Sequence, residues 1–302
     1  MAASSMTAKM TAQMSSKPGF IAALDQSGGS TPGALRLYGI PDTAYQSEAD
    51  MFRLIHEMRV RIITAQAFSS DYVIAAILFE GTMDGVAAGK PAASYLWEDR
   101  GIVPFLKVDK GLLPEQNGVS LMKPIPELDA LLARAVPLGI FGTKMRSVIN
   151  LASPVGIEAV VAQQFAIGTQ ISAHGLIPII EPEISIKSPQ KAEAETLLRD
   201  ALTKHLDALA QGQQVMLKLT IPDAPDFYAS LIAHPSVMRV VALSGGYTLE
   251  VACAGLAQNH GMTASFSRAL IDGLRAQMTD AEFDATLAAA IGQIYRASTV
   301  KK

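Results

Sequence analysis

The sequence has a single cysteine, Cys253, among 302 residues. One cysteine excludes a disulfide within the chain and a cysteine-based zinc site. This usage is typical of a reducing setting, so a cytoplasmic location is expected. The five histidines are scattered, without a pair at ligand spacing on one expected element, so no metal is expected. No Gly-x-Gly-x-x-Gly motif follows an expected strand, and no cofactor is therefore expected either.

Charge is also scarce, since only 18% of the residues are charged and the formal net charge is -3. Without an excess of basic residues, no global field draws the protein to nucleic acid or to an anionic membrane. We therefore expect neither as a partner. An anionic ligand would have to be held by a local cluster of cations. The sequence leaves oligomeric state open, a homo-oligomer included.

Long apolar runs are missing, because no stretch approaches the roughly 18 residues that span a bilayer. Residues 1–18 also lack the continuous apolar core of a secretory signal. This segment is rich in Met, Ser, Thr and Ala, contains Lys9 and Lys17, and has no acid. We expect an N-terminal extension or short helix here, with a targeting peptide as the alternative. Residues 19–302 are then expected to form one domain, which holds any catalytic site.

What the sequence does have is a series of eight short apolar runs separated by longer segments with helical periodicity. Alternation of this kind is typical of parallel βα units. The runs cover residues 20–24, 73–79, 103–108, 140–144, 176–180, 215–219, 237–243 and 262–266. The pattern predicts a single-domain α/β fold, a TIM (β/α)8 barrel. An open sheet is the alternative, because the fourth and eighth runs are weak.

Three of the intervening segments carry helix signals. Residues 48–68 have apolar residues at helical spacing, and Ser47 is placed to cap the start. Ser188 and Pro189 are expected to open a helix that ends near residue 210. Thr279 and Glu282 have the spacing of a capping box, which predicts a last helix ending near residue 296.

Polar residues that interrupt the apolar pattern fall at the carboxyl-terminal ends of the runs, where barrels of this kind place their active sites. In chain order they are Asp25 and Ser27, Lys107 and Asp109, Lys144 and Arg146, Glu181 and Glu183, Lys218, Ser244 to Gly246, and Ser267 with Arg268. A single charged residue at a strand end usually has no catalytic or binding role. A whole set at the ends of apolar strands is costly to bury unless the charges are paired or used, which indicates a shared site.

Two residues of this set suggest acid-base chemistry and one suggests a nucleophile. Glu181 and Glu183 share one face of a strand, so one of them could stay protonated and transfer protons. The alternative is that each pairs with a neighbouring cation. Lys218 is the best nucleophile candidate, because its apolar neighbours and nearby cations disfavour the charged form. Here the alternative is a structural lysine paired with Glu183.

Two clusters are candidate anion sites. The first anion site consists of Ser244, Gly245, Ser267 and Arg268, after the last two runs, where barrels commonly hold phosphate. The second anion site consists of Ser27, Ser30, Lys107 and Arg146. These would lie across one mouth from each other. Two such sites predict a ligand that is phosphorylated at both ends.

These motifs resemble those of class I fructose-bisphosphate aldolases, in the shorter bacterial form, over about residues 20–296. The resemblance is carried by Phe-Ile-Ala-Ala-Leu-Asp-Gln-Ser-Gly-Gly-Ser (20–30), Phe-Leu-Lys-Val-Asp-Lys-Gly (105–111), Gly-Thr-Lys-Met-Arg (142–146), Ile-Pro-Ile-Ile-Glu-Pro-Glu-Ile (177–184), Met-Leu-Lys-Leu (216–219), Leu-Ser-Gly-Gly (243–246) and Ser-Phe-Ser-Arg-Ala-Leu (265–270). It implies a metal-independent lyase of glycolysis and gluconeogenesis that binds sugar phosphates.

The resemblance also implies roles for single residues. Lys218 would form the Schiff base, Asp25 would transfer a proton, Glu183 would be the acid-base with Glu181 beside it, and Lys144 would be a cationic helper. The two anion sites would hold the two phosphates. Many family members have glycine at position 267, where Ser267 could still donate its backbone N–H.

A further departure concerns the later proton exchange. The longer animal-type enzymes use a terminal tyrosine at the enamine carbon, whereas the last tyrosine here is Tyr295, which we do not assign to that step. Alternative functions are a Schiff-base aldolase for tagatose or sedoheptulose bisphosphate, and a sugar-phosphate-binding protein without turnover.

Overall fold

The computed structural model describes residues 2–27 and 29–302, and it contains eight parallel strands that follow one another around a barrel in chain order. The strands are β1 (Phe20–Leu24), β2 (Val73–Leu78), β5 (Val103–Lys107), β7 (Gly142–Ile149), β8 (Ile177–Ile184), β9 (Val215–Thr220), β10 (Val237–Leu243) and β11 (Met262–Ala264). The Ala23 N–H donates to the Phe266 carbonyl at 3.1 Å, which joins the segment after β11 to β1. The predicted TIM barrel is therefore confirmed over an open sheet.

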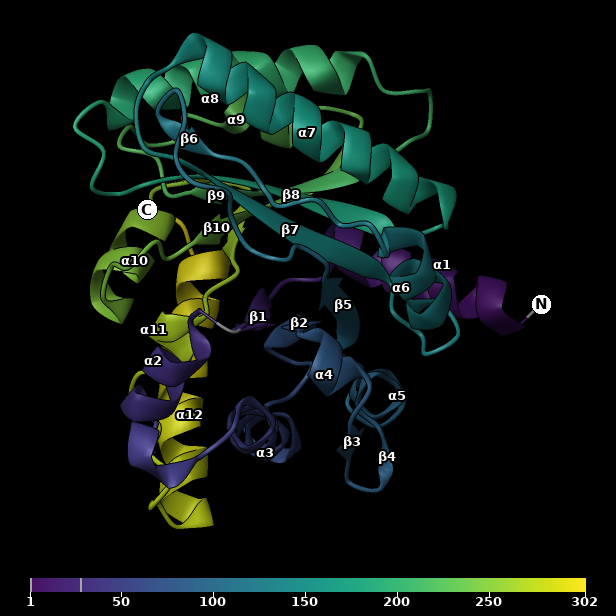
Figure 1. Ribbon diagram of the computed structural model, residues 1–302, viewed down its shortest axis with the longest axis vertical. Helices are drawn as coiled ribbons and strands as arrows, with labels where there is room; N and C mark the ends of the chain where they lie inside the picture. The colour runs from purple at the N-terminus through teal and green to yellow at the C-terminus, as the bar shows by residue number, and fades with distance from the viewer. Residues whose placement is uncertain (1, 28) are drawn as a thin grey trace.

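Helices alternate with the strands, and in Figure 1 the long α7 and α8 lie together over the side formed by β7 to β9. The helices after β1 are α2 (Thr31–Leu37), α3 (Glu48–Thr64), α4 (Glu80–Met83), α5 (Ala92–Ser94), α6 (Leu128–Ala135), α7 (Pro154–Ala173), α8 (Lys191–Asp207), α9 (Ala229–Ile232), α10 (Leu249–Leu256), α11 (Arg268–Ile271) and α12 (Asp280–Thr299). Shorter elements are η1 (Asp42–Ala44), η2 (Tyr95–Asp99), the hairpin strands β3 (Val86–Ala87) and β4 (Lys90–Pro91), and β6 (Val119–Ser120), which pairs antiparallel with β7.

Two of the three predicted helix starts are confirmed. The Ser47 hydroxyl accepts the Asp50 N–H at 3.1 Å, and Thr279 and Glu282 form the full capping box of α12. The start of α8 was wrong by two to three residues, because the helix begins at Lys191. Ser188 instead accepts the Gln190 N–H at 3.2 Å in the preceding turn.

Strands β7 and β8 are longer than the apolar runs that predicted them, and both extend beyond their first charged residue. Arg146, Glu181 and Glu183 thus lie inside strands rather than after them. A charged side chain can occupy a strand when it points into the mouth of the barrel and its neighbours point out into the helical layer. In β8, Ile180 and Ile184 pack in the outer core cluster while Glu181 lines a cavity.

The amino-terminal end of the barrel is closed by α1 (Ala2–Ser16). Its Met10 and Met14 are 1% and 0% exposed and pack in the inner cluster with residues such as Ile21 and Met216. The Gln13 amide donates to the Ile74 carbonyl at 2.8 Å. The region predicted as an extension or short helix is thus a helix docked under the barrel, at the end opposite the predicted active site.

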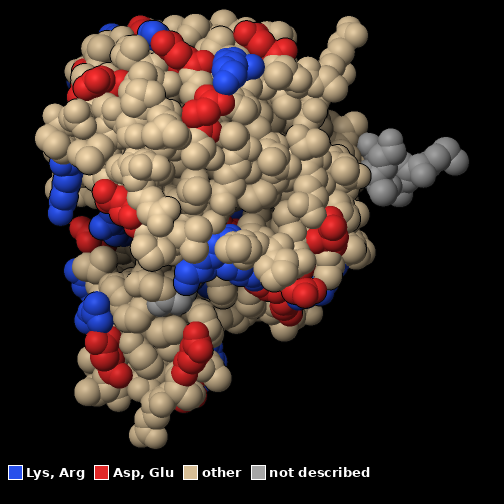
Figure 2. All heavy atoms as spheres, turned by 45° about the horizontal axis from the view of Figure 1, so that its top comes forward, with Lys and Arg blue, Asp and Glu red and all other residues tan. Residues whose placement is uncertain are grey.

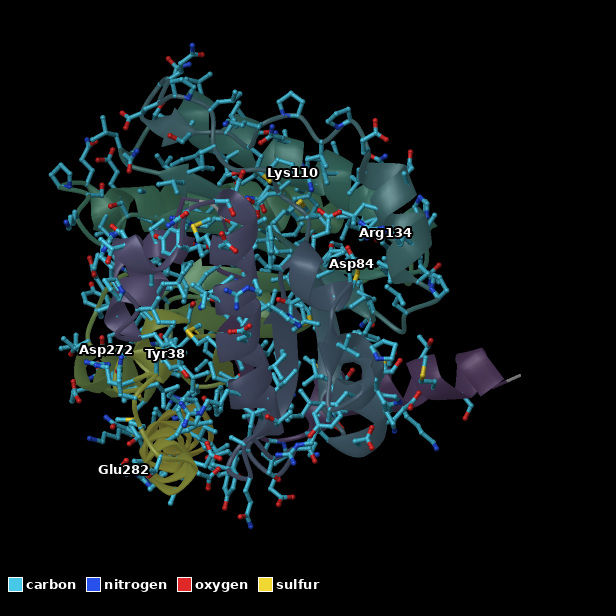
Figure 3. All side chains as sticks on the ribbon, turned by 60° about the horizontal axis from the view of Figure 1, so that its bottom comes forward. Tyr38, Asp84, Lys110, Arg134, Asp272 and Glu282 are labelled. Carbon is cyan, nitrogen blue, oxygen red and sulfur yellow. The ribbon has the colours of Figure 1, made fainter. Side chains whose placement is uncertain are left out.

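Outside the barrel, exposed ion pairs join α4 to α6 and to the segment after β5 (Figure 3). Lys110 Nζ lies 2.7 Å from a Glu80 carboxylate oxygen, and Arg134 contacts both Glu80 and Asp84. Such surface pairs stabilise by at most about 1 kcal/mol each. They fix the outer layer and are separate from the site described next.

Candidate active site

A cavity of about 880 Å³ opens at the carboxyl-terminal ends of the strands. It brings together all of the candidate catalytic and anion-site residues: Asp25, Ser27, Ser30, Lys107, Lys144, Arg146, Glu181, Glu183, Lys218, Ser244, Gly245, Ser267 and Arg268. They come from seven strands and the segments that follow them. Their convergence follows from closure of the barrel, because parallel strands end at a common mouth.

At the floor of this cavity, carboxylates and ammonium groups alternate in an unbroken row. Lys144 Nζ lies 2.6 Å from an Asp25 oxygen and 3.0 Å from a Glu181 oxygen. The other Glu181 oxygen lies 3.1 Å from Lys218 Nζ. Each of the four side chains is at least 90% buried, so the charges interact with little screening by water.

The ion pairs of this row keep Asp25 and Lys144 in their charged forms. Burial opposes ionisation of Asp25, but Lys144 and Lys218 hold the pKa of its carboxyl well below the usual range. Burial likewise opposes the charge on Lys144, but Asp25 and Glu181 hold the pKa of its ammonium above the usual range. Because a nucleophilic amine must be neutral, Lys144 is unsuited to attack a carbonyl. Lys218, at the end of the row, is the better candidate.

Glu181 and Glu183 have different partners although they share a face of β8. Glu181 contacts both lysines of the row, whereas Glu183 forms an ion pair with Arg146. This arrangement corresponds to the alternative prediction, in which each of the two carboxylates forms an ion pair with a neighbouring cation. It places Glu181, rather than the Glu183 that the resemblance suggested, beside Lys218.

The first anion site is built on a glycine turn. Gly245 and Gly246 have φ values of +58° and +109°, conformations that L side chains rarely adopt. A Cβ at Gly246 would lie 3.2 Å from Arg268 Nη2, so the absence of a side chain lets the guanidinium lie against this turn. Arg268 is exposed at the cavity, and it pairs with no carboxylate of the described part of the chain.

The second anion site differs, because its cations already have carboxylate partners. Lys107 Nζ lies 2.6 Å from Asp109 Oδ1, and Arg146 pairs with Glu183. Burial lowers the pKa of Lys107, and Asp109 opposes that shift. Ser27 and Ser30 belong to one turn, in which the Ser27 N–H donates to the Ser30 hydroxyl at 3.1 Å. Gly28, between them, lies outside the described residues.

Several lining residues were not proposed as site residues from the sequence. They include Gln26, Arg36 and Ser265, with the buried Arg59 behind Gln26. One signal was available: Arg59 falls on the apolar face of α3, four residues after Ile55, where a charge requires partners. Gln26 carried no signal, because a glutamine beside a strand end is ordinary.

Tyr295, which we left unassigned, lies far from the cavity. Its ring packs edge-on against Tyr72, 5.1 Å between centroids, directly before β2 at the amino-terminal end of the barrel.

The described residues contain neither a cluster of metal-ligating side chains nor a membrane-spanning helix. Within residues 2–27 and 29–302, no group of three or more His, Cys, Asp and Glu side chains could hold a metal ion. No described helix is both long and apolar enough to cross a bilayer. On the face drawn in Figure 2, the described basic and acidic side chains are interspersed on a surface made mostly of other residues.

The family model of class I fructose-bisphosphate aldolase matches residues 9–222. The chain belongs to this family. It is 57% identical over 286 residues to a class 1 fructose-bisphosphate aldolase of Synechocystis sp., which covers 95% of each chain. It is 56% identical over 293 residues to the class 1 enzyme of Porphyromonas gingivalis, covering 97% of this chain and 99% of the relative. The resemblance seen in the motifs is thereby confirmed, as is the expected enzyme class, an aldolase and thus a lyase.

The fold comparison agrees. A solved fructose-bisphosphate aldolase from Plasmodium falciparum superimposes with a TM-score of 0.73 at 20% identity, covering 99% of this chain and 96% of that one. At this identity the similarity shows the barrel architecture alone.

Proposed function

We propose that this aldolase reversibly cleaves fructose 1,6-bisphosphate into dihydroxyacetone phosphate and glyceraldehyde 3-phosphate, in glycolysis and gluconeogenesis, through a Schiff base on Lys218. The observation that carries the mechanism is the buried Lys218 amine, 3.1 Å from Glu181, in a cavity with anion sites on two sides. Membership of the family supports the substrate.

In the first half of the reaction, Lys218 passes a proton to the Glu181 carboxylate that it contacts, and the freed amine attacks the C2 ketone. Transfer of a second amine proton to the ketone oxygen completes the carbinolamine. Glu181 then returns its proton to the carbinolamine hydroxyl, which leaves as water. We assign this role to Glu181 instead of Glu183 because Glu181 contacts Lys218. The iminium that results is an electron sink, which covalent capture provides without a metal.

In the second half, the ionised Asp25 accepts the proton of the C4 hydroxyl and the C3–C4 bond breaks. The bonding electrons move to the iminium and form an enamine, while glyceraldehyde 3-phosphate leaves. Protonation at C3 and attack of water on the iminium then release dihydroxyacetone phosphate. Lys144, held between Asp25 and Glu181, keeps both carboxylates oriented and its positive charge stabilises both of them.

The strand order suggests which phosphate each anion site holds. Lys218 lies on β9, and the first anion site follows β10 and β11, the next strands around the barrel. The residues of the second site follow or belong to β1, β5 and β7. Because the captured carbon is C2, the phosphate on C1 belongs at the nearer first site. The phosphate on C6 then belongs at the second.

A coupled assay tests the proposal. Fructose 1,6-bisphosphate should be cleaved in EDTA, with a higher kcat/KM than tagatose 1,6-bisphosphate or sedoheptulose 1,7-bisphosphate, and Lys218→Met should abolish turnover. A higher kcat/KM for another ketose bisphosphate would assign that substrate. Absence of turnover with all three would leave a sugar-phosphate-binding protein.

We also propose a cytoplasmic setting. It is supported by the single cysteine, Cys253, which is buried and free. Recovery of the native protein with cytoplasmic marker enzymes after cell fractionation tests this location, and recovery with another compartment would contradict it.

A further inference from the structure

Gln26 bridges two parts of the cavity that are far apart in the sequence. It follows Asp25 at the end of β1, is 7% exposed, and lines the cavity. Its amide Nε2 donates to the Ser267 hydroxyl oxygen at 2.8 Å. Gln26 therefore touches a member of the first anion site although it belongs to the segment that enters the second.

The direction of the Gln26 amide is set by Arg59, a residue of α3 that is 1% exposed. Arg59 Nε and Nη2 each lie 3.4 Å from Gln26 Oε1, Nη2 also donates to the Gln26 carbonyl, and Nη1 donates to Thr82 at 2.9 Å. A guanidinium offers only donors, so the amide oxygen must face it. The amide NH2 must then face Ser267.

This orientation determines what the Ser267 hydroxyl can do. A hydroxyl has one hydrogen to donate and two lone pairs that accept. Gln26 fills a lone pair and leaves the hydrogen free. Ser267 precedes α11 but makes no capping hydrogen bond with its side chain, and it lines the cavity next to Arg268. The free hydroxyl hydrogen can therefore point toward the first anion site.

We propose that the Ser267 hydroxyl donates a hydrogen bond to the C1 phosphate of the substrate, and that Gln26, held by Arg59, is the positioning residue that directs it. The inference rests on the proposed function, which places a ketose phosphate in this site. It goes beyond the backbone N–H that the family resemblance assigned to position 267, where a glycine would offer no hydroxyl.

The test uses dihydroxyacetone phosphate as the probe, and measures its half-saturating concentration for borohydride-trapped adduct. Ser267→Ala keeps the backbone N–H and removes the hydroxyl. Its half-saturating concentration should rise about tenfold, as expected for a lost hydrogen bond to a charged group. Dihydroxyacetone, which has no phosphate, should be trapped by wild type and variant alike. Ser15→Ala on α1 is the matched control and should change neither value.

A double-mutant cycle distinguishes an effect of Gln26 on the orientation of the Ser267 hydroxyl from an effect of Gln26 on packing. Gln26→Met removes the amide at similar side-chain length and should raise the half-saturating concentration about threefold. In the Ser267→Ala background it should have no further effect, because it acts through the hydroxyl.

Two results would overturn the inference: an unchanged half-saturating concentration in Ser267→Ala, or a Gln26→Met effect that persists undiminished without the hydroxyl. Failure of the wild-type protein to form any adduct would instead refute the proposed function.

Discussion

At the residue scale, the division of roles between Glu181 and Glu183 is open to direct measurement. Glu181→Gln should lower kcat by at least about 100-fold, because it removes the group that exchanges protons with the Lys218 adduct. Glu183→Gln leaves that contact intact and should chiefly raise KM, since it frees Arg146 and disturbs the second anion site. Steady-state kinetics of both variants distinguish the roles. The reverse pattern would assign the chemistry to Glu183.

The depressed pKa of Asp25 predicts a pH dependence of stability. A carboxyl whose folded pKa lies below its usual 3.8 stabilises the protein fully above that pH, and the contribution is lost as pH falls below it. The difference in unfolding free energy between wild type and Asp25→Asn should therefore shrink below pH 3.8, by up to about 1.4 kcal/mol per pH unit. Urea unfolding at pH 6, 4 and 3 measures it. Asp71→Asn, an exposed control, should show no such change.

The sequence alone predicted most members of the cavity and selected Lys218 as the nucleophile, but it did not distinguish the roles of Glu181 and Glu183. Polar residues at strand ends identify the mouth, since closure of a barrel brings them together. Glu181 and Glu183 share a face, so only the positions of Lys144 and Arg146 on the neighbouring strand distinguish them. The contact of Gln26 with Ser267 spans 241 residues and follows from closure rather than from any local pattern.

At the element scale, the distance between Glu181 and Lys218 depends on how β8 and β9 separate. Their backbone pairing covers Ile179 with Met216 and Ile180 with Leu217, and stops there. Beyond this point the Thr220 hydroxyl donates to the Ile184 carbonyl at 2.7 Å. This buried hydrogen bond joins the carboxyl-terminal ends of β8 and β9, just beyond Glu181 and Lys218.

Thr220→Val should therefore weaken catalysis, since it keeps the shape and removes the bond. We expect kcat to fall about tenfold with little change in KM, because a displacement of the pair affects proton transfer more than phosphate binding. Thr220→Ser keeps the hydroxyl and should retain near-normal activity. Equal losses in both variants would indicate a packing effect.

The elements themselves were largely predictable, and the misses have a physical cause. Apolar runs located every barrel strand, but they ended β7 and β8 too early, because a charge inside a strand looks like its end until the cavity is known. The short strands β3, β4 and β6 were not predicted. The capping box was a strong enough local signal to locate the start of α12. Ser188 and Pro189 did not locate the start of α8, because the turn before this helix uses the same residue types as a helix start.

At the scale of the whole molecule, α1 completes the barrel by inserting Met14 under its inner layer. Met14→Ala should cost about 3 kcal/mol of unfolding free energy, as for other buried methionines, and lower Tm. Met6→Ala, on the same helix but only partly buried, should cost much less. Because the cavity is at the other end, kcat at low temperature should be unchanged in both. A large loss of kcat in folded Met14→Ala would show that α1 influences the site.

The most direct test of the account is the identity of the residue that carries substrate. The protein is incubated with dihydroxyacetone phosphate, reduced with borohydride, digested, and mapped by mass spectrometry. One reduced adduct on the peptide that contains Lys218 is predicted, and none in Lys218→Met. An adduct on Lys144 or Lys107, or no adduct at all, would contradict the mechanism.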